Sequence, residues 1–271
     1  MAKPVKDEIF GSRKSVLKDK LDIRIFRNLF FATCLRRINP DPASRYIFLQ
    51  DCAAPAEYKD TGLASIIPFF NEAIRFGNVF FSGEKVQIKN LRNNSGRIFY
   101  RHEEFADFLL KLLKGVGSEP LSPSTARIVE SEEVSTLSRF LRKNLYGRVG
   151  STDIDFVLFH PHTHRLLLVE EKLFVGEIGP GIGHGQYLSY RELLQDGFAE
   201  AQRGNIRFYL LFIPDPAKDI CYMYDFSKER SLPQRSPSYY DPTRMEQRII
   251  FPYPDLEKLS VGEFLGKYVF G

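Results

Sequence analysis

The chain has 271 residues, of which 43% are hydrophobic and 27% are charged, and its formal net charge is +4. This length supports one large domain or two smaller ones, each with its own core. No apolar run reaches the roughly 18 residues of a membrane span, and the start, MAKPVKDEIF, is too polar for a secretory signal. The composition therefore excludes a membrane partner and predicts a cytoplasmic protein.

Residues 1–114 are predicted to form a basic module of helices and a hairpin. They contain 20 Lys and Arg against 13 Asp and Glu, whereas the remainder contains 18 against 21. Apolar spacing predicts helices within 13–37, 62–76 and 102–114, and alternation predicts strands at 78–81, 85–89 and 97–101. Helices followed by a basic hairpin would suit a winged-helix-like module that contacts nucleic acid.

Five basic side chains in and around this hairpin are the candidates for phosphate contact: Lys85, Lys89, Arg92, Arg97 and Arg101. Lysine and arginine bind the phosphate backbone without regard to base sequence. The alternative is a solvated surface, because lysines on the outer strand of a hairpin also prevent edge-to-edge pairing. The charge asymmetry of the chain is compatible with both interpretations.

Residues 115–127 are rich in Gly, Pro and Ser and are predicted to be a linker or a long loop before a second domain at 128–271. In this domain the pattern predicts helices at 131–145 and 186–203, and strands at 153–160, 165–172, 206–213 and 221–226. This order indicates an α/β fold, a mixed sheet flanked by helices. The tail at 239–271 is expected to dock on the core, with a homodimer contact as the alternative.

Charged residues stand at the ends of two predicted strands that are otherwise apolar. Side chains two residues apart on a strand share a face, so Glu170 and Lys172 lie on one face and Glu171 on the other. A turn at 161–164 folds the first strand back onto the second and brings Asp155 beside Glu170. Because buried charges are costly without partners, this pattern predicts a site for a hard divalent cation.

Magnesium favours oxygen ligands and keeps several of its waters. The carboxylates of Asp155 and Glu170 and the backbone carbonyl of Glu171 could supply the protein oxygens. A metal held there polarises a phosphodiester and lowers the pKa of a bound water, and Lys172 could orient that water or stabilise transition-state charge. The predicted cofactor is Mg²⁺, with Mn²⁺ as a substitute.

Asp155, fourteen intervening residues and then Glu170-Glu171-Lys172 resemble the motif of the PD-(D/E)xK nuclease superfamily. Thr152 or Ile154 stands where the proline of the motif's name would precede the aspartate. Farther along, Gln186-Tyr187-Leu188-Ser189-Tyr190 is similar to the Q-x-x-x-Y element of RecB-like members. The resemblance covers roughly residues 128–226 and leaves the first 114 residues unexplained.

This resemblance implies a restriction-endonuclease-like core and a metal-dependent hydrolase of phosphodiester bonds. It implies that Gln186 faces the catalytic site and that Tyr190 belongs to the nucleic-acid-binding surface. The superfamily often has an acidic residue on the helix before the first motif strand. Glu133 is the candidate for it, with Glu130 and Glu132 as rivals.

The leading hypothesis is therefore a magnesium-dependent DNA endonuclease with residues 1–114 selecting the substrate, in restriction or another defence role. The alternative is a catalytically inactive DNA-binding or assembly protein with a nuclease-like core. An RNA nuclease would differ from the leading hypothesis in substrate alone.

Overall fold

The computed structural model describes residues 23–33, 46–59, 62–113, 135–145, 150–173, 179–215, 218–242 and 246–271. The chain divides into two compact units, one of Met1–Arg27, Asp155–Leu194 and Gly204–Gly271, the other of Asn28–Ile154 and Gln195–Arg203. Both units take segments from either side of the linker predicted at 115–127. That linker and Glu133 lie outside the described residues, so the predicted three-part division stays a prediction. In the described ranges, no helix is long and apolar enough to cross a membrane.

Five strands of the first unit form a mixed sheet in the order β13-β10-β9-β7-β6. β7 and β9 run parallel, and the other neighbouring pairs run antiparallel. The strands are β6 (Gly150–His160, in this unit from Asp155 onward), β7 (Arg165–Leu173), β9 (Ile206–Ile213), β10 (Cys221–Asp225) and β13 (Glu257–Leu259). The strands predicted at 153–160, 165–172, 206–213 and 221–226 are thereby confirmed.

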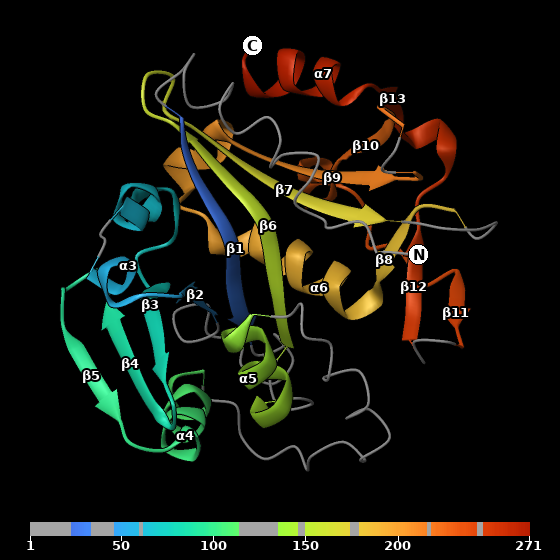
Figure 1. The fold of residues 1–271 in the computed structure, drawn as a ribbon. Helices are drawn as coiled ribbons and strands as arrows, with labels where there is room; N and C mark the ends of the chain where they lie inside the picture. Colours follow the sequence, from blue (N-terminus) through green and yellow to red (C-terminus); the bar gives the residue numbers. More distant parts are fainter. Residues whose placement is uncertain are drawn as a thin grey trace. The chain divides into compact units, whose positions relative to one another are not determined.

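Different helices cover the two faces of this sheet (Figure 1). On one face, α6 (His184–Glu192) packs Tyr190 against Phe208, with ring centroids 4.8 Å apart. On the opposite face, α7 (Val261–Phe264) continues as a wider helical turn and packs Phe264 against Tyr209 at 5.7 Å. Burial on both faces explains the continuous apolar run of β7, because neither side of a central strand meets water.

A second, small sheet in this unit has the order β11-β12-β8 and is antiparallel throughout. Its strands are β8 (Gly181–Gly183), β11 (Tyr239–Asp241) and β12 (Glu246–Ile250). A side chain at Gly181 would place its Cβ 2.6 Å from the carbonyl oxygen of Ile249, so the close pairing requires glycine here. Short helical turns at Phe226–Arg230 and Tyr253–Asp255 complete the unit.

The second unit contains five neighbouring strands in the order β1-β2-β3-β4-β5, with β2 and β3 parallel and the other pairs antiparallel. The strands are β1 (Arg24–Thr33, in this unit from Asn28 onward), β2 (Tyr46–Cys52), β3 (Arg75–Ser82), β4 (Lys85–Asn90) and β5 (Gly96–Phe99). The helical elements are α3 (Pro55–Lys59), η2 (Gly62–Phe69), α4 (His102–Leu112) and α5 (Thr136–Leu145). A π turn (Leu193–Gly197) and η5 (Glu200–Asn205) belong to this unit in part, from Gln195 to Arg203. Both units are therefore mixed sheets flanked by helices, as the α/β prediction requires.

The core of the second unit is also two-sided. Phe105 and Leu109 of α4 and Leu141 of α5 pack with Val86 and Ile88 in one cluster. The other face of the sheet is aromatic and includes Phe48, which stacks on Phe76 with centroids 5.0 Å apart at an interplanar angle of 7°. The helices and strands predicted around 78–114 are confirmed, with boundaries shifted by a few residues.

The helix predicted over 13–37 is wrong for residues 24–33, which form β1; the other residues of that range lie outside the described part. Phe30 and Ala32 enter the core beside α4, whereas Phe31 contacts Phe48 on the opposite face, with centroids 5.5 Å apart. A short, fully buried apolar run fits helical and strand periodicity equally, and burial on both faces selects the strand.

The helix predicted over 62–76 is also wrong in its second half. A 3-10 helix covers Gly62–Phe69 with Pro68 inside it, and β3 begins at Arg75. Proline removes a backbone donor and limits the helix, so the chain turns before the strand. In the described part of residues 13–76, neither predicted long helix is found, and the winged-helix-like expectation depended on these helices.

The turn of the β3–β4 hairpin contains a glycine with a left-handed backbone conformation. Ser82 pairs with Lys85 across the turn, and Gly83 has a φ of +61°. A Cβ at Gly83 would meet nothing within 4 Å, so a Gly83→Ala variant adds left-handed strain alone. We expect a loss of about 1 kcal/mol in the free energy of unfolding, measured by urea denaturation.

The matched control is Gly185→Ala. Gly185 lies in α6, also in open space, but has no positive φ. Alanine favours the helix there, so we expect unchanged or higher stability. Equal stabilities of the Gly83→Ala variant and the wild type would contradict the strained turn.

Candidate active site

β6 and β7 bring two acidic side chains to one face of the first unit's sheet. The register pairs Phe156 with Val169, which places Asp155 opposite Glu170 one step farther along. The backbone N–H of Asp155 donates to Oε2 of Glu170 at 3.3 Å. The Oδ2 atom of Asp155 accepts a hydrogen bond from the backbone N–H of Glu171 at 2.8 Å. The two carboxylates are therefore held on adjacent strands by hydrogen bonds that cross between them.

Lys172 and Gln186 contact the same glutamate. The Oε1 atom of Glu170 accepts hydrogen bonds from Nζ of Lys172 and, at 3.1 Å, from Nε2 of Gln186. The side chain of Glu170 is 0% exposed and that of Lys172 is 19% exposed. The buried carboxylate thus contacts both an ammonium group and an amide, and the side chain that bears the ammonium is partly exposed.

Gln186 owes its position to α6. Its Nε2 atom also donates to the hydroxyl of Tyr190, one helical turn later, at 2.8 Å. Tyr190 is fully buried against Phe208, so in this structure its hydroxyl orients Gln186 and does not reach the surface. The glutamine and the tyrosine of the Q-x-x-x-Y element are four residues apart, so they lie on the same face of α6.

Not every candidate joins the cluster. The side chain of Glu171 shares its face with Val169, in the core on the α7 side of the sheet, and its backbone alone contacts Asp155. Glu133 lies outside the described residues. The structure therefore brings together Asp155, Glu170, Lys172 and Gln186.

Asp155 and Glu170 offer carboxylate oxygens, the ligand type that hard divalent ions prefer. Within the described residues, no group of three or more His, Cys, Asp or Glu side chains could hold a metal. Magnesium does not need such a cage, since one or two carboxylates commonly hold it while waters and substrate phosphates fill the other positions. The carboxylates of Asp155 and Glu170 are ligands of that kind. A structural zinc site would need histidine or cysteine ligands.

A second buried ionic cluster beside α6 was missed from the sequence. Glu229 is 0% exposed and accepts hydrogen bonds from the hydroxyls of Tyr187 at 2.7 Å and Tyr224 at 2.5 Å. It also accepts one from Nε of Arg235 at 2.8 Å. Burial raises the pKa of Tyr187 to about 12, and the hydrogen bond to the Glu229 carboxylate contributes to this shift. Because Tyr187 directly follows Gln186 on α6, this cluster anchors the helix that carries Gln186.

The five basic candidates of the second unit do not share one surface. Lys85 and Lys89 alternate with the buried Val86 along β4, whereas Arg97 pairs with Ile88 and shares its core-side face. The Nζ atom of Lys89 donates to the carbonyl of Lys59 at 3.3 Å. The two lysines therefore lie on one face of these strands, and Arg97 lies on the other.

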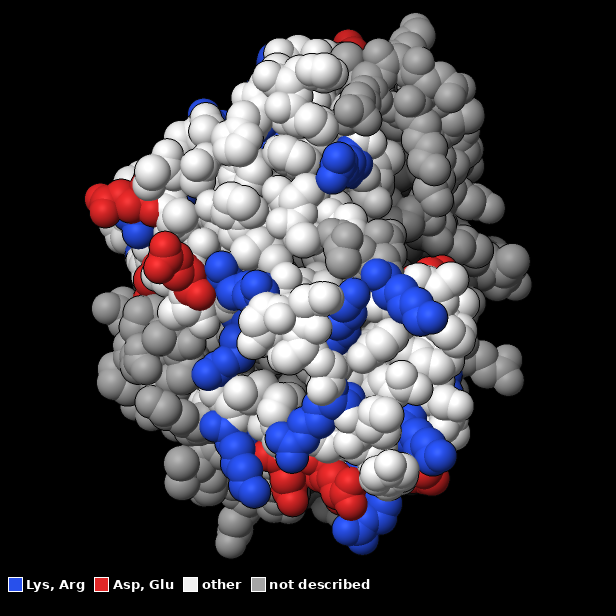
Figure 2. All heavy atoms as spheres, turned by 90° about the vertical axis from the view of Figure 1, so that its left-hand side faces the viewer, with Lys and Arg blue, Asp and Glu red and all other residues white. Residues whose placement is uncertain are grey.

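The remaining two basic candidates have structural partners. Arg92 donates to the carbonyls of Ile74 at 2.6 Å and Asn71 at 2.8 Å, and burial lowers its pKa. Arg101 forms an ion pair with Glu104 at 3.1 Å. On the face that Figure 2 displays, lysine and arginine side chains are spread among uncharged ones, with acidic groups near several of them.

No protein-family model, curated protein sequence or solved structure matches this chain. Function must therefore be inferred from the chemistry of the site. Two carboxylates offer hard oxygen ligands, an ammonium group offers positive charge, and an amide fixes one carboxylate. This set suits metal-assisted attack on an anionic ester, in which negative charge grows in the transition state.

Proposed function

We propose that this chain is a magnesium-dependent nuclease of the PD-(D/E)xK type that hydrolyses phosphodiester bonds in DNA. The observation that carries the proposal is the convergence of Asp155, Glu170 and Lys172 on one sheet face, with Gln186 bonded to Glu170. A buried carboxylate–ammonium pair has a desolvation cost that well-packed apolar residues would avoid. A catalytic role gives a reason for keeping the pair.

Asp155 and Glu170 would hold the ion, with the carbonyl of Glu171 as a third oxygen. The bound ion would polarise the phosphate and lower the pKa of a water. Lys172 lies beside Glu170 with a partly exposed side chain, and it would donate a hydrogen bond to a phosphate oxygen as negative charge accumulates there. Gln186 would keep the Glu170 carboxylate in one orientation, because its amide bonds both Glu170 and Tyr190.

Digestion of supercoiled plasmid tests this proposal. With Mg²⁺ we expect nicked or linear products, and EDTA should abolish them. Asp155→Asn should lower the cleavage rate at least about a hundredfold, because the substitution removes a charged metal ligand. The matched control is Asp215→Asn, an exposed aspartate in an ion pair with Lys218 in the same unit, which should cut normally.

A result of equal cleavage by the Asp155→Asn and Asp215→Asn variants would refute the site. Parallel digestion of an RNA of similar length decides the substrate. Faster cleavage of RNA than of DNA would overturn the assignment to DNA.

A second candidate function is a non-catalytic DNA-binding or assembly protein. The complete burial of Glu170, with both carboxylate oxygens engaged by protein donors, favours it. Such a protein would bind DNA with a steep salt dependence and would show no metal-dependent turnover. The plasmid assay separates the two functions.

A further inference from the structure

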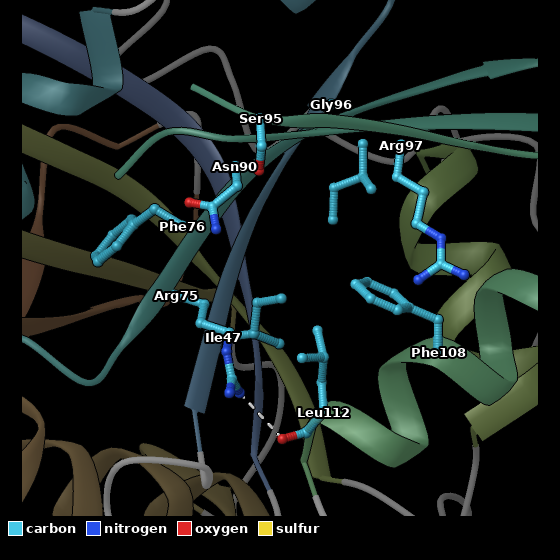
Figure 3. A pocket seen from close by; sticks show the side chains of 10 residues that line it. Ile47, Arg75, Phe76, Asn90, Ser95, Gly96, Arg97, Phe108 and Leu112 are labelled. Carbon is cyan, nitrogen blue, oxygen red and sulfur yellow. Dashed lines mark hydrogen bonds between the residues drawn. The ribbon is translucent and has the colours of Figure 1, made fainter. Parts of the chain in front are cut away.

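A cavity of about 290 Å³ lies in the second unit, between the sheet and the C-terminal half of α4 (Figure 3). Apolar side chains from both layers line it, including Ile47 of β2, Ile88 of β4 and Leu112 of α4. Its volume is close to the lower end of the range for ligand pockets. The cavity therefore has room for a small molecule with an apolar body.

The charged residues among those that line the cavity are both arginines, Arg75 and Arg97. Within the described part of the chain, neither forms an ion pair with an aspartate or glutamate. Two cations and no aspartate or glutamate line the cavity, and this charge balance favours an anion.

The two arginines differ in how the protein holds them. Arg75 donates from Nη1 to the carbonyl oxygen of Leu112 at 3.0 Å and so caps the end of α4 (Figure 3). The guanidinium of Arg97 lies over two rings, 4.9 Å from the centroid of Phe99 and 5.2 Å from that of Phe108. These cation–π contacts hold the guanidinium over the two rings, and its N–H groups are the donors that an anion would use.

We propose that this cavity binds a small anionic amphiphile, whose apolar body contacts Ile47, Ile88 and Leu112 and whose carboxylate or phosphate head group binds Arg97. The planar guanidinium of an arginine can offer two parallel N–H donors to such a head group. Arg75 adds positive charge at the α4 end of the cavity. The inference is independent of the proposed nuclease, because every residue in it belongs to the second unit.

Titration with four eight-carbon probes tests the proposal: octanoate, octyl phosphate, octan-1-ol and octylamine, each followed by calorimetry and by NMR of the Leu112 and Ile88 methyl groups. We expect at least one of the two anions to bind at least about tenfold more tightly than octan-1-ol, since a charge-assisted pair adds to apolar contact. Octylamine should not bind. The tighter of the two anions identifies the head group.

Arg97→Gln should weaken the binding of that anion at least about tenfold and leave octan-1-ol unaffected. Arg101→Gln is the matched control, because Arg101 is exposed, is paired with Glu104 and does not line the cavity. The proposal is overturned if octan-1-ol binds as tightly as both anions, if no probe shifts the methyl signals, or if Arg97→Gln binds the anion normally. If the Arg97→Gln variant does not fold, the comparison of the four probes on the wild-type protein still tests the proposal.

Discussion

A Lys172→Met variant should retain metal binding and lose DNA cleavage. Removing the ammonium increases the negative potential at Glu170, so Mn²⁺ should bind at least as tightly as it does to the wild type. The cleavage rate should fall at least about a hundredfold, because the variant lacks the donor that would stabilise transition-state charge. Calorimetric titration with Mn²⁺ and plasmid digestion with Mg²⁺ measure the two effects.

The same variant should show a metal-dependent stability. Without metal, the fully buried Glu170 loses its ionic partner, and we expect a loss of about 3 kcal/mol in the free energy of unfolding. Saturating Mg²⁺ should restore part of it, since a ligand that binds the native state stabilises it. Lys218→Met, which breaks an exposed pair with Asp215, should change stability by less than about 1 kcal/mol. Normal cleavage by the Lys172→Met variant would contradict the role given to Lys172.

Glu229→Gln should have the largest effect on stability among the changes considered. Glu229 is completely buried and bonds three donors, and the substitution leaves Arg235, 24% exposed, without its buried anion. We expect a loss of about 3 kcal/mol or more in the free energy of unfolding, measured by urea denaturation at neutral pH. The substitution preserves the shape of the side chain, so the loss reports charge and hydrogen bonding.

Asp255→Asn is the control for that effect. Asp255 contacts the same guanidinium at 3.2 Å but is 41% exposed, so water screens the pair and the loss should stay below about 1 kcal/mol. Equal losses in the free energy of unfolding for the two variants would contradict a larger contribution of the buried cluster to stability. If the cluster also anchors α6, the Glu229→Gln variant should cut DNA more slowly under conditions in which it remains folded.

The core of the candidate site could be predicted from the sequence because local rules decide it. The apolar runs of β6 and β7 are short and are separated by four turn residues, of which His164 has a φ of +51°. A tight turn fixes the antiparallel register, and strand alternation then places Glu170 and Lys172 on one face. Helical spacing likewise places Gln186 and Tyr190 on one face of α6.

Other features depend on contacts between distant segments. β1 could not be distinguished from a helix by its sequence because its apolar run is buried on both faces. Its strand conformation becomes evident from its pairing with β2 in the structure. The cluster at Glu229 gathers residues from positions 187, 224 and 235, with no spacing that singles it out. The same holds for Arg92, which the sequence suggests as a phosphate contact because of its charge. Its hydrogen bonds to two backbone carbonyls could not be foreseen from the sequence.

The most direct test of the central proposal is the position of a metal ion in crystals soaked with Mn²⁺, located by its anomalous scattering. The proposal predicts a peak bound to carboxylate oxygens of both Asp155 and Glu170, at about the 2.1 Å typical of octahedral Mg²⁺ sites. It also predicts that the peak disappears in crystals of the Asp155→Asn variant. Crystals with Mn²⁺ bound elsewhere and none beside these two carboxylates would contradict it.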